Sequence, residues 1–232
     1  MAWTNGYRLI SNTGTWLEFF NAVKSAMQEN TGYNIINDDT DYSFTIDFGN
    51  GFTCVVSDIV ITGESIATRS NTLKLMIYQN SVLKNSITIS YGGNSAQAEN
   101  TTRTISIFTY SNDKIKILGI DHYNSSIPYI PLSSCSFIEC RYKDIATNEE
   151  KNIFKIHNTT MYDLNGNNLV WTTTFSKASN GIVLLNELIT QGSEITGYLP
   201  DIYNCTTVQP YSHYMINNQK YYSIDPNLLV KE

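Results

Sequence analysis

The stretch YSFTIDFGNGFTCVVSD, residues 42–58, carries the pattern that decides the fold. Its first seven residues alternate between polar and apolar side chains, which is typical of a strand with one buried face. Gly49-Asn50-Gly51 comes next, and a second apolar run follows it. Gly and Asn accept the positive φ angles of a tight turn. The stretch therefore predicts a β-hairpin and leads us to expect an antiparallel sheet.

Further strand patterns follow at short intervals, and several lie on either side of a turn signal. Ser111-Asn112-Asp113 separates two of them and the charged connection DIATNEEK separates two more, so the sequence predicts a second and a third hairpin. GGNSAQAENTT, residues 92–102, predicts a polar loop, and residues 185–190 allow a second, short helix. The predicted strands cover residues 73–79, 86–91, 102–110, 114–123, 135–142, 152–157, 168–175 and 181–185.

The strongest helix pattern covers residues 15–30. Thr15 and Glu18 have the spacing of a capping box, in which each side chain binds a free amide of the first turn. Apolar side chains recur at helical spacing, and Gly32 follows as a stop signal. A stripe of this kind packs on the protein's own sheet more often than it binds a ligand. Its members are Trp16, Phe20, Val23 and Met27, flanked by Phe19, Ala22 and Ala26.

These patterns together predict an α+β fold. We expect a predominantly antiparallel β-sheet or sandwich with an N-terminal amphipathic helix at residues 15–30. The polar, turn-rich residues 159–168 predict a boundary between a helix-plus-sheet domain, residues 1–160, and a smaller β-rich region, residues 161–232. A single domain is the alternative.

Composition narrows the classes of partner. The chain has 232 residues and a formal net charge of −6. No block of Lys or Arg occurs, so we expect no direct binding of nucleic acid. No apolar run is long enough to predict a membrane span. The opening MAWTNGYRLI has no charged start followed by an apolar core, so we expect no secretory signal there.

Four cysteines are too few to predict a disulfide scaffold in a chain of this length. Cys54 lies in an apolar strand pattern, which favours a buried small hydrophobic side chain. Cys135 and Cys140 are five positions apart, and in an extended strand an odd separation places them on opposite faces. We therefore expect no local disulfide or metal pair there. The fourth cysteine is Cys205, and chance N-x-[ST] sequons occur at Asn100, Asn124, Asn158 and Asn204.

The titratable residues form no recognisable catalytic pattern. His122 follows Asp121 directly, but a base and its orienting carboxylate are defined by spatial geometry, so adjacency in sequence means little. Glu139 and Glu194 fit a glycosidase pair by residue type only. No motif for a nucleophile, a phosphate loop or a zinc site occurs. We predict no enzyme and no cofactor. The histidines are His122, His157 and His213.

Two clusters of oxygen-bearing side chains have the residue types of cation ligands. The first is NDDTD, and the second, DLNGNN, shows the alternation of a calcium loop. The second pattern fails where it should be specific, because Asn168 replaces the glycine and Thr174 replaces the bidentate Glu. Turn chemistry explains both clusters, so we predict no metal site. The clusters contain Asp38, Asp39 and Asp41, and Asp163, Asn165 and Asn167.

The last stretch, residues 196–232, is rich in tyrosine. GYLP predicts a turn, and HYMINNQKYYSI predicts a hairpin because Asn217 and Asn218 suit the positive φ angles of its turn. Tyr combines a large apolar face with a polar tip, so we expect a rigid docking surface. The alternative is that these rings only close the protein's own core. The candidate surface is formed by Tyr198, Tyr203, Tyr211, Tyr214, Tyr221 and Tyr222.

Two segments resemble virion structural proteins of tailed bacteriophages. One is TWLEFFNAVKSAMQENTGYNI, a helix that leads into FTIDFGNGFTCVVSDIVITG. The other is EITGYLPDIYN followed by HYMINNQKYYSIDPNLLVKE. The resemblance covers the two ends of the chain, less than half of it, and carries over no functional residues.

The resemblance implies a non-enzymatic virion component of the tail, baseplate or neck, assembled in the cytoplasm of the bacterial host. Its partners would be other virion proteins and copies of itself in a homo-oligomeric ring or array. A capsid decoration protein is the nearest variant. A carbohydrate- or receptor-binding module is a second class, although Trp3, Trp16 and Trp171 favour core packing over sugar stacking. A hydrolase of cell-wall polymers is a third.

Overall fold

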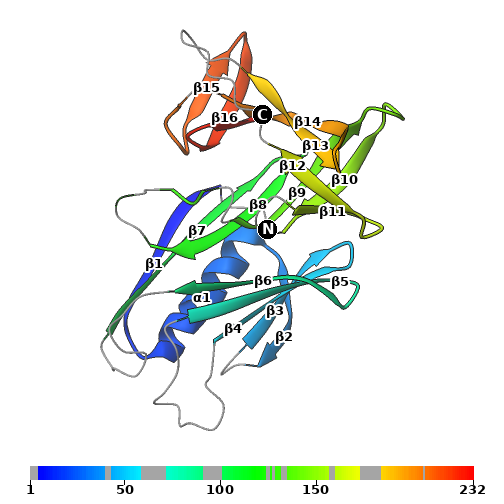
Figure 1. Ribbon diagram of the computed structural model, residues 1–232. Coiled ribbons are helices and arrows are strands. Elements are labelled where there is room, and N and C mark those ends of the chain that lie inside the picture. The colour runs from blue at the N-terminus through cyan, green and yellow to red at the C-terminus, as the bar shows by residue number, and fades with distance from the viewer. Residues whose placement is uncertain are drawn as a thin grey trace. The chain divides into compact units, whose positions relative to one another are not determined.

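The computed structural model describes residues 5–39, 43–58, 72–90, 101–123, 126, 129–131, 135–156, 160–172, 184–205 and 207–232 (Figure 1). Packing divides the chain into two compact units. Unit 1 comprises Met1–Thr109 and Leu118–Pro128, and unit 2 comprises Tyr110–Ile117 and Tyr129–Glu232. The boundary predicted at residue 160 falls inside unit 2. The prediction of a mostly antiparallel β structure is confirmed.

Five strands of unit 1 form an open antiparallel meander. The hairpin predicted around Gly49-Asn50-Gly51 is present, and the Asp47 carboxylate accepts a hydrogen bond from the Gly49 amide at 2.8 Å. One strand starts four residues earlier than predicted, because Asn80 (φ 47°) and Ser81 (φ 67°) make a two-residue turn. The strands are β2 (Asn34–Asp39), β3 (Ser43–Gly49), β4 (Phe52–Asp58), β5 (Thr72–Gln79) and β6 (Val82–Ser90).

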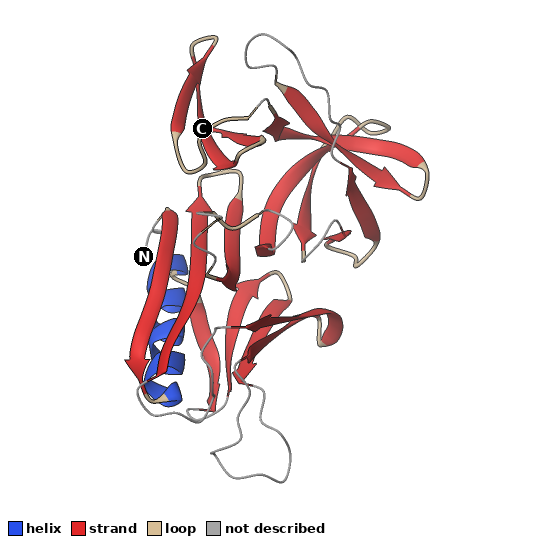
Figure 2. Ribbon diagram, turned by 60° about the vertical axis from the view of Figure 1, so that its left-hand side comes forward, coloured by secondary structure: helices blue, strands red, loops and turns tan. Residues whose placement is uncertain are grey.

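The helix α1 (Trp16–Thr31) lies where its caps predict it. The Thr15 amide donates to Glu18 Oε2 at 2.8 Å, and the Glu18 amide donates to Thr15 Oγ1 at 3.3 Å, which completes the capping box. Gly32 ends the helix in the left-handed region at φ 64°. The helix lies beside strands of unit 1 (Figure 2), and its buried face packs on the meander. The Phe20 and Phe44 rings meet edge to face, 5.4 Å apart.

Three further strands lie wholly or largely in unit 1: β1 (Gly6–Gly14), β7 (Thr101–Ser111) and β8 (Lys116–His122). The last two residues of β7 and the first two of β8 belong to unit 2. β1 pairs with β7 along its whole length, and β7 is followed by β8 in the sheet, as the second predicted hairpin requires. The sequence does not predict β1, because GYRLISNTG has no clear alternation. The Arg103 guanidinium is buried in this unit and donates to the Gly14 carbonyl at 2.7 Å.

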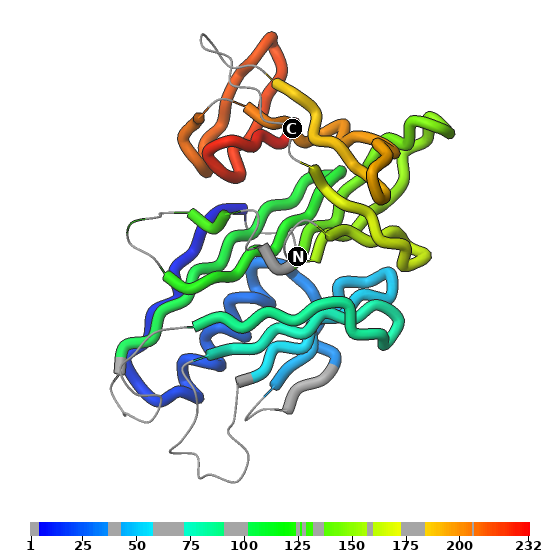
Figure 3. The backbone as a smooth tube through the Cα atoms, in the orientation of Figure 1, coloured from blue at the N-terminus to red at the C-terminus, as the bar shows by residue number. Residues whose placement is uncertain are grey.

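In unit 2, six strands form a closed ring rather than a sandwich. Each strand pairs antiparallel with the next, and the last pairs back with the first (Figure 3). The ring includes the third predicted hairpin, whose strands are β9 and β10. The ring strands are β9 (Cys135–Asp144), β10 (Glu150–Lys155), β11 (Thr160–Asp163), β12 (Asn168–Thr172), β13 (Leu185–Gln191) and β14 (Glu194–Asn204).

A glycine permits the ring to close. Gly197 faces Asp144 where β14 meets β9, and a Cβ at this position would lie 2.3 Å from the Lys143 carbonyl oxygen and 2.6 Å from the Tyr142 ring. No side chain larger than hydrogen fits at that separation. The Ile145 amide donates to the Thr196 carbonyl at 3.0 Å and extends the seam.

Two sequence predictions in this region are wrong. Residues 185–190 form strand β13, not a helix, because burial of Glu187 and Ile189 alternates with a period of two and β14 supplies the backbone partners. GYLP lies inside β14 and is not a turn. Pro200 is tolerated there because it lies in an irregularity of the β13–β14 register, where no partner requires its missing N–H.

The chain ends in three strands that continue from the ring, β15 (His213–Ile216), β16 (Gln219–Asp225) and β17 (Leu228–Lys231). β17 pairs with β14, β16 with β17, and β15 is the outer edge. The Asn-Asn hairpin prediction is confirmed: Asn217 and Asn218 have φ angles of 51° and 62°.

Candidate functional site

The structure gathers most of the terminal tyrosines within unit 2. Tyr203, Tyr214 and Tyr221 lie together on one face of the terminal strands, where they pack with Cys205 and Leu229. The Tyr203 and Tyr221 rings meet edge to face at 5.7 Å. Burial raises the pKa of Tyr203 and Tyr221. This cluster therefore holds β15 and β16 against β14.

Tyr222 lies on the opposite face from Tyr221, since neighbouring residues of a strand point to opposite faces. Its ring stacks on Tyr110, with centroids 4.8 Å apart and planes inclined by 10°. Tyr211 anchors another segment, because its hydroxyl accepts a hydrogen bond from the Ile130 amide at 2.7 Å. Tyr198 is half-buried at the ring closure, opposite Lys143. These tyrosine contacts hold the terminal strands in place. Tyr221 and Tyr222 are buried, whereas the other four tyrosines remain partly exposed.

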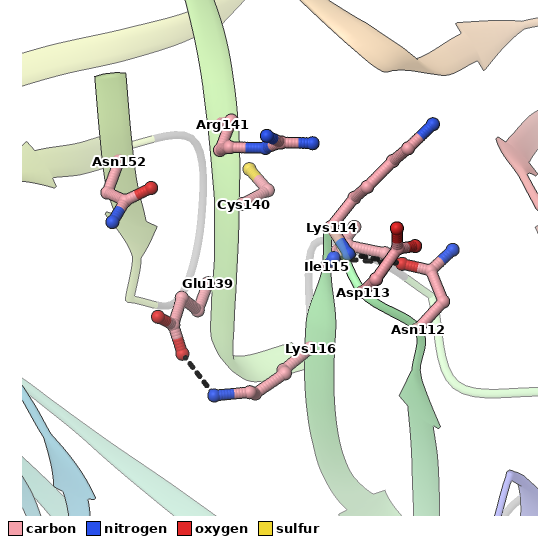
Figure 4. A pocket seen from close by; sticks show the side chains of 9 residues that line it. All are labelled: Asn112, Asp113, Lys114, Ile115, Lys116, Glu139, Cys140, Arg141 and Asn152. Carbon is pink, nitrogen blue, oxygen red and sulfur yellow. Dashed lines mark hydrogen bonds and ion pairs between the residues drawn. The ribbon is translucent and has the colours of Figure 1, made fainter. Parts of the chain in front are cut away.

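A pocket of about 210 Å³ lies between β9 and the turn that joins β7 to β8 (Figure 4). Lysine, arginine and carboxylate side chains line it. Lys116 Nζ is 3.1 Å from Glu139 Oε2 across it. Its wall consists of Asn112, Asp113, Lys114, Ile115, Lys116, Glu139, Cys140, Arg141 and Asn152.

The other cations of the pocket are also paired. Lys114 Nζ lies 2.9 Å from Asp201 Oδ1. Arg141 Nη1 lies 2.8 Å from Glu150 Oε2, and Arg141 Nη2 lies 3.8 Å from Asp201 Oδ2. Asp201 therefore joins a lysine of the β7–β8 turn to an arginine of the ring. Charges balanced in this way hold the elements of a fold together.

Asn112 gives the β7–β8 turn its shape. Its Oδ1 accepts hydrogen bonds from the Lys114 amide at 2.9 Å and the Ile115 amide at 3.0 Å. Its Nδ2 donates to the Lys231 carbonyl at 3.2 Å. One side chain thus closes the turn and binds it to β17.

The pocket offers little for nucleophilic chemistry. Burial raises the pKa of the Cys140 thiol far above its usual range, and Glu139 adds to that effect, so the thiol stays protonated near neutral pH. Cys54 and Cys205 are buried free thiols as well, and burial raises the pKa of each to about 12. The prediction of a buried Cys54 is confirmed.

The remaining candidates from the sequence are dispersed. The exposed His122 ring lies 3.0 Å from Asp121 Oδ1, and His213 lies 2.9 Å from Glu232 Oε2. Glu194 is exposed at the start of β14. Trp171 and Asn204 are buried, so neither can serve as a sugar platform or a glycan acceptor in the folded chain. The positions that fall outside the described residues, or whose side chains do, are Trp3, Asp38, Asp39, Asp41, Asn100, Asn124, Cys135, His157 and Asn158.

The DLNGNN segment is a tight turn. Asp163 Oδ1 accepts from the Asn167 amide and Asp163 Oδ2 from the Asn167 side chain, both at 2.8 Å. The carboxylate is thereby used within its own turn, as turn chemistry predicts. Among the residues that the structure describes, no three His, Cys, Asp or Glu side chains lie together in a way that would hold a metal.

The sequence reasoning missed the charge network and a buried carboxyl. Lys114 and Lys116 are two apart in sequence, as are Glu139 and Arg141, so a period of two would have placed each pair on one strand face. Glu187, the one charged residue of the mostly apolar run LLNELI, would have been the signal for a buried acid. In the described part of the chain, no helix has the length and hydrophobicity of a membrane-crossing segment.

Comparisons with known proteins add no relative: no family model, no curated protein and no solved structure matches this chain.

Proposed function

We propose that this chain is a non-enzymatic structural component of a bacteriophage virion, in the tail, baseplate or neck, that joins neighbouring proteins through its C-terminal hairpin. We also propose that unit 1 has an α+β fold in which α1 forms one layer. The resemblance of the chain's two ends to virion structural proteins supports the proposed function. The structural observation that carries the docking role is the character of β15.

β15 is a short sheet edge that carries no Lys, Arg, carboxylate or proline. An edge strand exposes unpaired backbone groups, and proteins that must not associate place charges or proline there. Two other sheet edges that the structure describes carry charged side chains, Arg8 in β1 and Lys84 in β6. β15 reads HYMI and has no lysine, arginine, carboxylate or proline.

The side chains of β15 suit an added strand. Met215 is 69% exposed, the largest value among the large apolar residues that the structure describes as exposed. Tyr214 and Ile216 are half-buried on the opposite face, over the tyrosine cluster. A partner strand paired with β15 would gain backbone hydrogen bonds and cover Met215. The tyrosine contacts would keep the hairpin rigid, which lowers the entropy cost of docking.

The direct test is the composition of purified phage particles. Mass spectrometry should find this chain in fixed stoichiometry with the other virion proteins. Its absence from intact particles would contradict the proposal. Its location with the tail or with the capsid shell would decide between a tail-type component and a capsid decoration protein.

A point substitution tests the docking strand. Met215→Lys places a charge on the edge and should reduce incorporation into particles at least tenfold, while the folded monomer keeps its stability within about 0.5 kcal/mol. Val82→Lys, at a position 59% exposed on β6, is the matched control and should leave incorporation unchanged. Equal incorporation of Met215→Lys and the parent would rule out β15 as the docking strand. Deleting residues 207–232 would be a poor substitute, because Leu229 and Tyr222 are buried.

A further inference from the structure

Unit 2 buries a carboxyl group that the proposed function does not use. Glu187 of β13 has no exposed surface, and its Oε2 accepts a hydrogen bond from Trp171 Nε1 of β12 at 2.9 Å. Its Oε1 has no hydrogen-bond partner among the described residues, and neither does Nδ2 of the buried Asn204 on β14. A buried polar network that is satisfied only in part is costly, and an ionised carboxylate makes it costlier.

The described surroundings of Glu187 include a second acid. Lys155 of β10 is buried too, and its ammonium lies 5.8 Å from the centroid of the Trp171 ring. Asp225 of β16 disfavours the ionised form of the carboxyl. Ionised Glu187 would therefore face an indole N–H, an amide and a like charge.

We propose that Glu187 is a proton-linked latch: folded unit 2 holds this side chain as a neutral acid, and loss of its proton weakens the join between β13, β14 and the C-terminal strands. The position of the group explains the link. Glu187 lies at the register irregularity between β13 and β14, and β14 pairs on its other edge with β17. A charge at this point acts on the strands that carry β15.

The direction of the pH dependence follows from the environment. Burial raises the pKa of Glu187 from 4.5 to about 7, and Asp225 adds to the rise, while the hydrogen bond from Trp171 and the nearby Asn204 amide oppose it. Below pH 4.5 both the folded and the unfolded chain are protonated at this site. Between pH 4.5 and 7 the unfolded chain gives up the proton while the folded chain keeps it, so stability falls as the pH rises. Above pH 7 the loss reaches its limit.

The test compares the full-length chain with Glu187→Gln, which keeps the shape of the side chain and removes the titration. From pH 5 to pH 8 the folding equilibrium constant of the parent should fall roughly 70-fold more than that of Glu187→Gln. The exposed Glu194→Gln is the matched control and should follow the parent. Parallel pH profiles for the parent and Glu187→Gln would overturn the proposal.

A second measurement can be made on the parent chain, with one variant as a supplement. The ¹³C carboxyl resonance of Glu187 and the indole N–H resonance of Trp171 should shift together with one midpoint near pH 7. In Trp171→Phe the hydrogen bond that opposes the rise is gone, so the carboxyl midpoint should move to higher pH. A Glu187 midpoint near that of an exposed glutamate would show that the site is not a latch.

Discussion

The two units bury the faces of their sheets in different ways. The meander of unit 1 stays open, and α1 covers its apolar face through contacts such as Phe20 on Phe44. The ring of unit 2 closes on itself through the pairing of β14 with β9 and encloses its own core. An open sheet thus depends on side chains brought by another element, whereas a closed sheet depends on backbones that can approach each other. The first unit should be sensitive to loss of volume, and the second to its addition.

Removing volume beneath the helix should have the largest effect. Phe20 is 2% exposed, and Phe20→Ala should lower the free energy of unfolding of unit 1 by about 4 kcal/mol through lost burial and the cavity left behind. Denaturant titration followed by ¹⁹F NMR of fluorotryptophan-labelled protein would report unit 1 at Trp16 and unit 2 at Trp171. Leu83→Ala, at a position 51% exposed, is the control and should change little. If Phe20→Ala caused unfolding at Trp171 before unfolding at Trp16, the predicted difference between the two units would be wrong.

Adding volume at the ring closure should come next. Gly197→Ala puts a methyl group against the Lys143 carbonyl and the Tyr142 ring, and should destabilise unit 2 by about 3 kcal/mol. Gly192→Ala in the neighbouring turn meets no atom within 4 Å, so it carries only the strain of its φ of 61°, about 1 kcal/mol. Thermal unfolding of both variants, with Trp171 as reporter, measures the difference. Equal losses would mean that close backbone approach does not limit the ring.

The helix cap should have a smaller effect, confined to unit 1. Thr15→Ala removes the acceptor for the Glu18 amide and should reduce stability by about 1 kcal/mol. Thr15→Ser keeps the hydroxyl and should behave like the parent. Amide hydrogen exchange in the first turn of α1 would show the loss locally. Unchanged exchange in Thr15→Ala would indicate that packing alone fixes the start of the helix.

The smallest expected change is a gain. Ser81 adopts a φ of 67° in the β5–β6 turn, a region that a non-glycine residue enters at a cost. Ser81→Gly should therefore raise the stability of the open meander by roughly 0.5–1 kcal/mol. Asn218→Gly in the β15–β16 turn should gain less, because Asn already tolerates this region. Denaturation midpoints at constant m-value would rank the two.

Local features of this fold were predictable from the sequence because they rest on neighbouring residues. Thr15 with Glu18 predicted the start of α1, and Asn217-Asn218 predicted the last hairpin. GYLP wrongly predicted a turn, because proline and glycine usually mark turns. Here Pro200 lies at a register irregularity of β14, and Gly197 lies in the same strand where the backbone of β9 comes close. A ring closure between residues 144 and 197 leaves no local pattern.

The candidate site was less predictable than the fold, because its contacts join residues that are far apart in the sequence. Lys114 and Asp201 are 87 positions apart, and only the packing of unit 2 brings them within 2.9 Å. The tyrosines were visible in the sequence, but burial of Tyr221 and Tyr222 depends on partners such as Tyr203 and Tyr110. Exposure at β15 likewise depends on which strand ends the sheet.

The short segment Tyr110–Ile117 determines how this protein can be divided. It belongs to unit 2, although the chain on both sides of it belongs to unit 1. A fragment that starts at residue 129 would lack the Tyr110 ring that stacks on Tyr222 and the Lys114 ammonium that pairs with Asp201. No single cut in the chain therefore releases an intact unit 2. Recombination that exchanges one unit for a homologous one must transfer two separate pieces of the gene, so the two units should be inherited together.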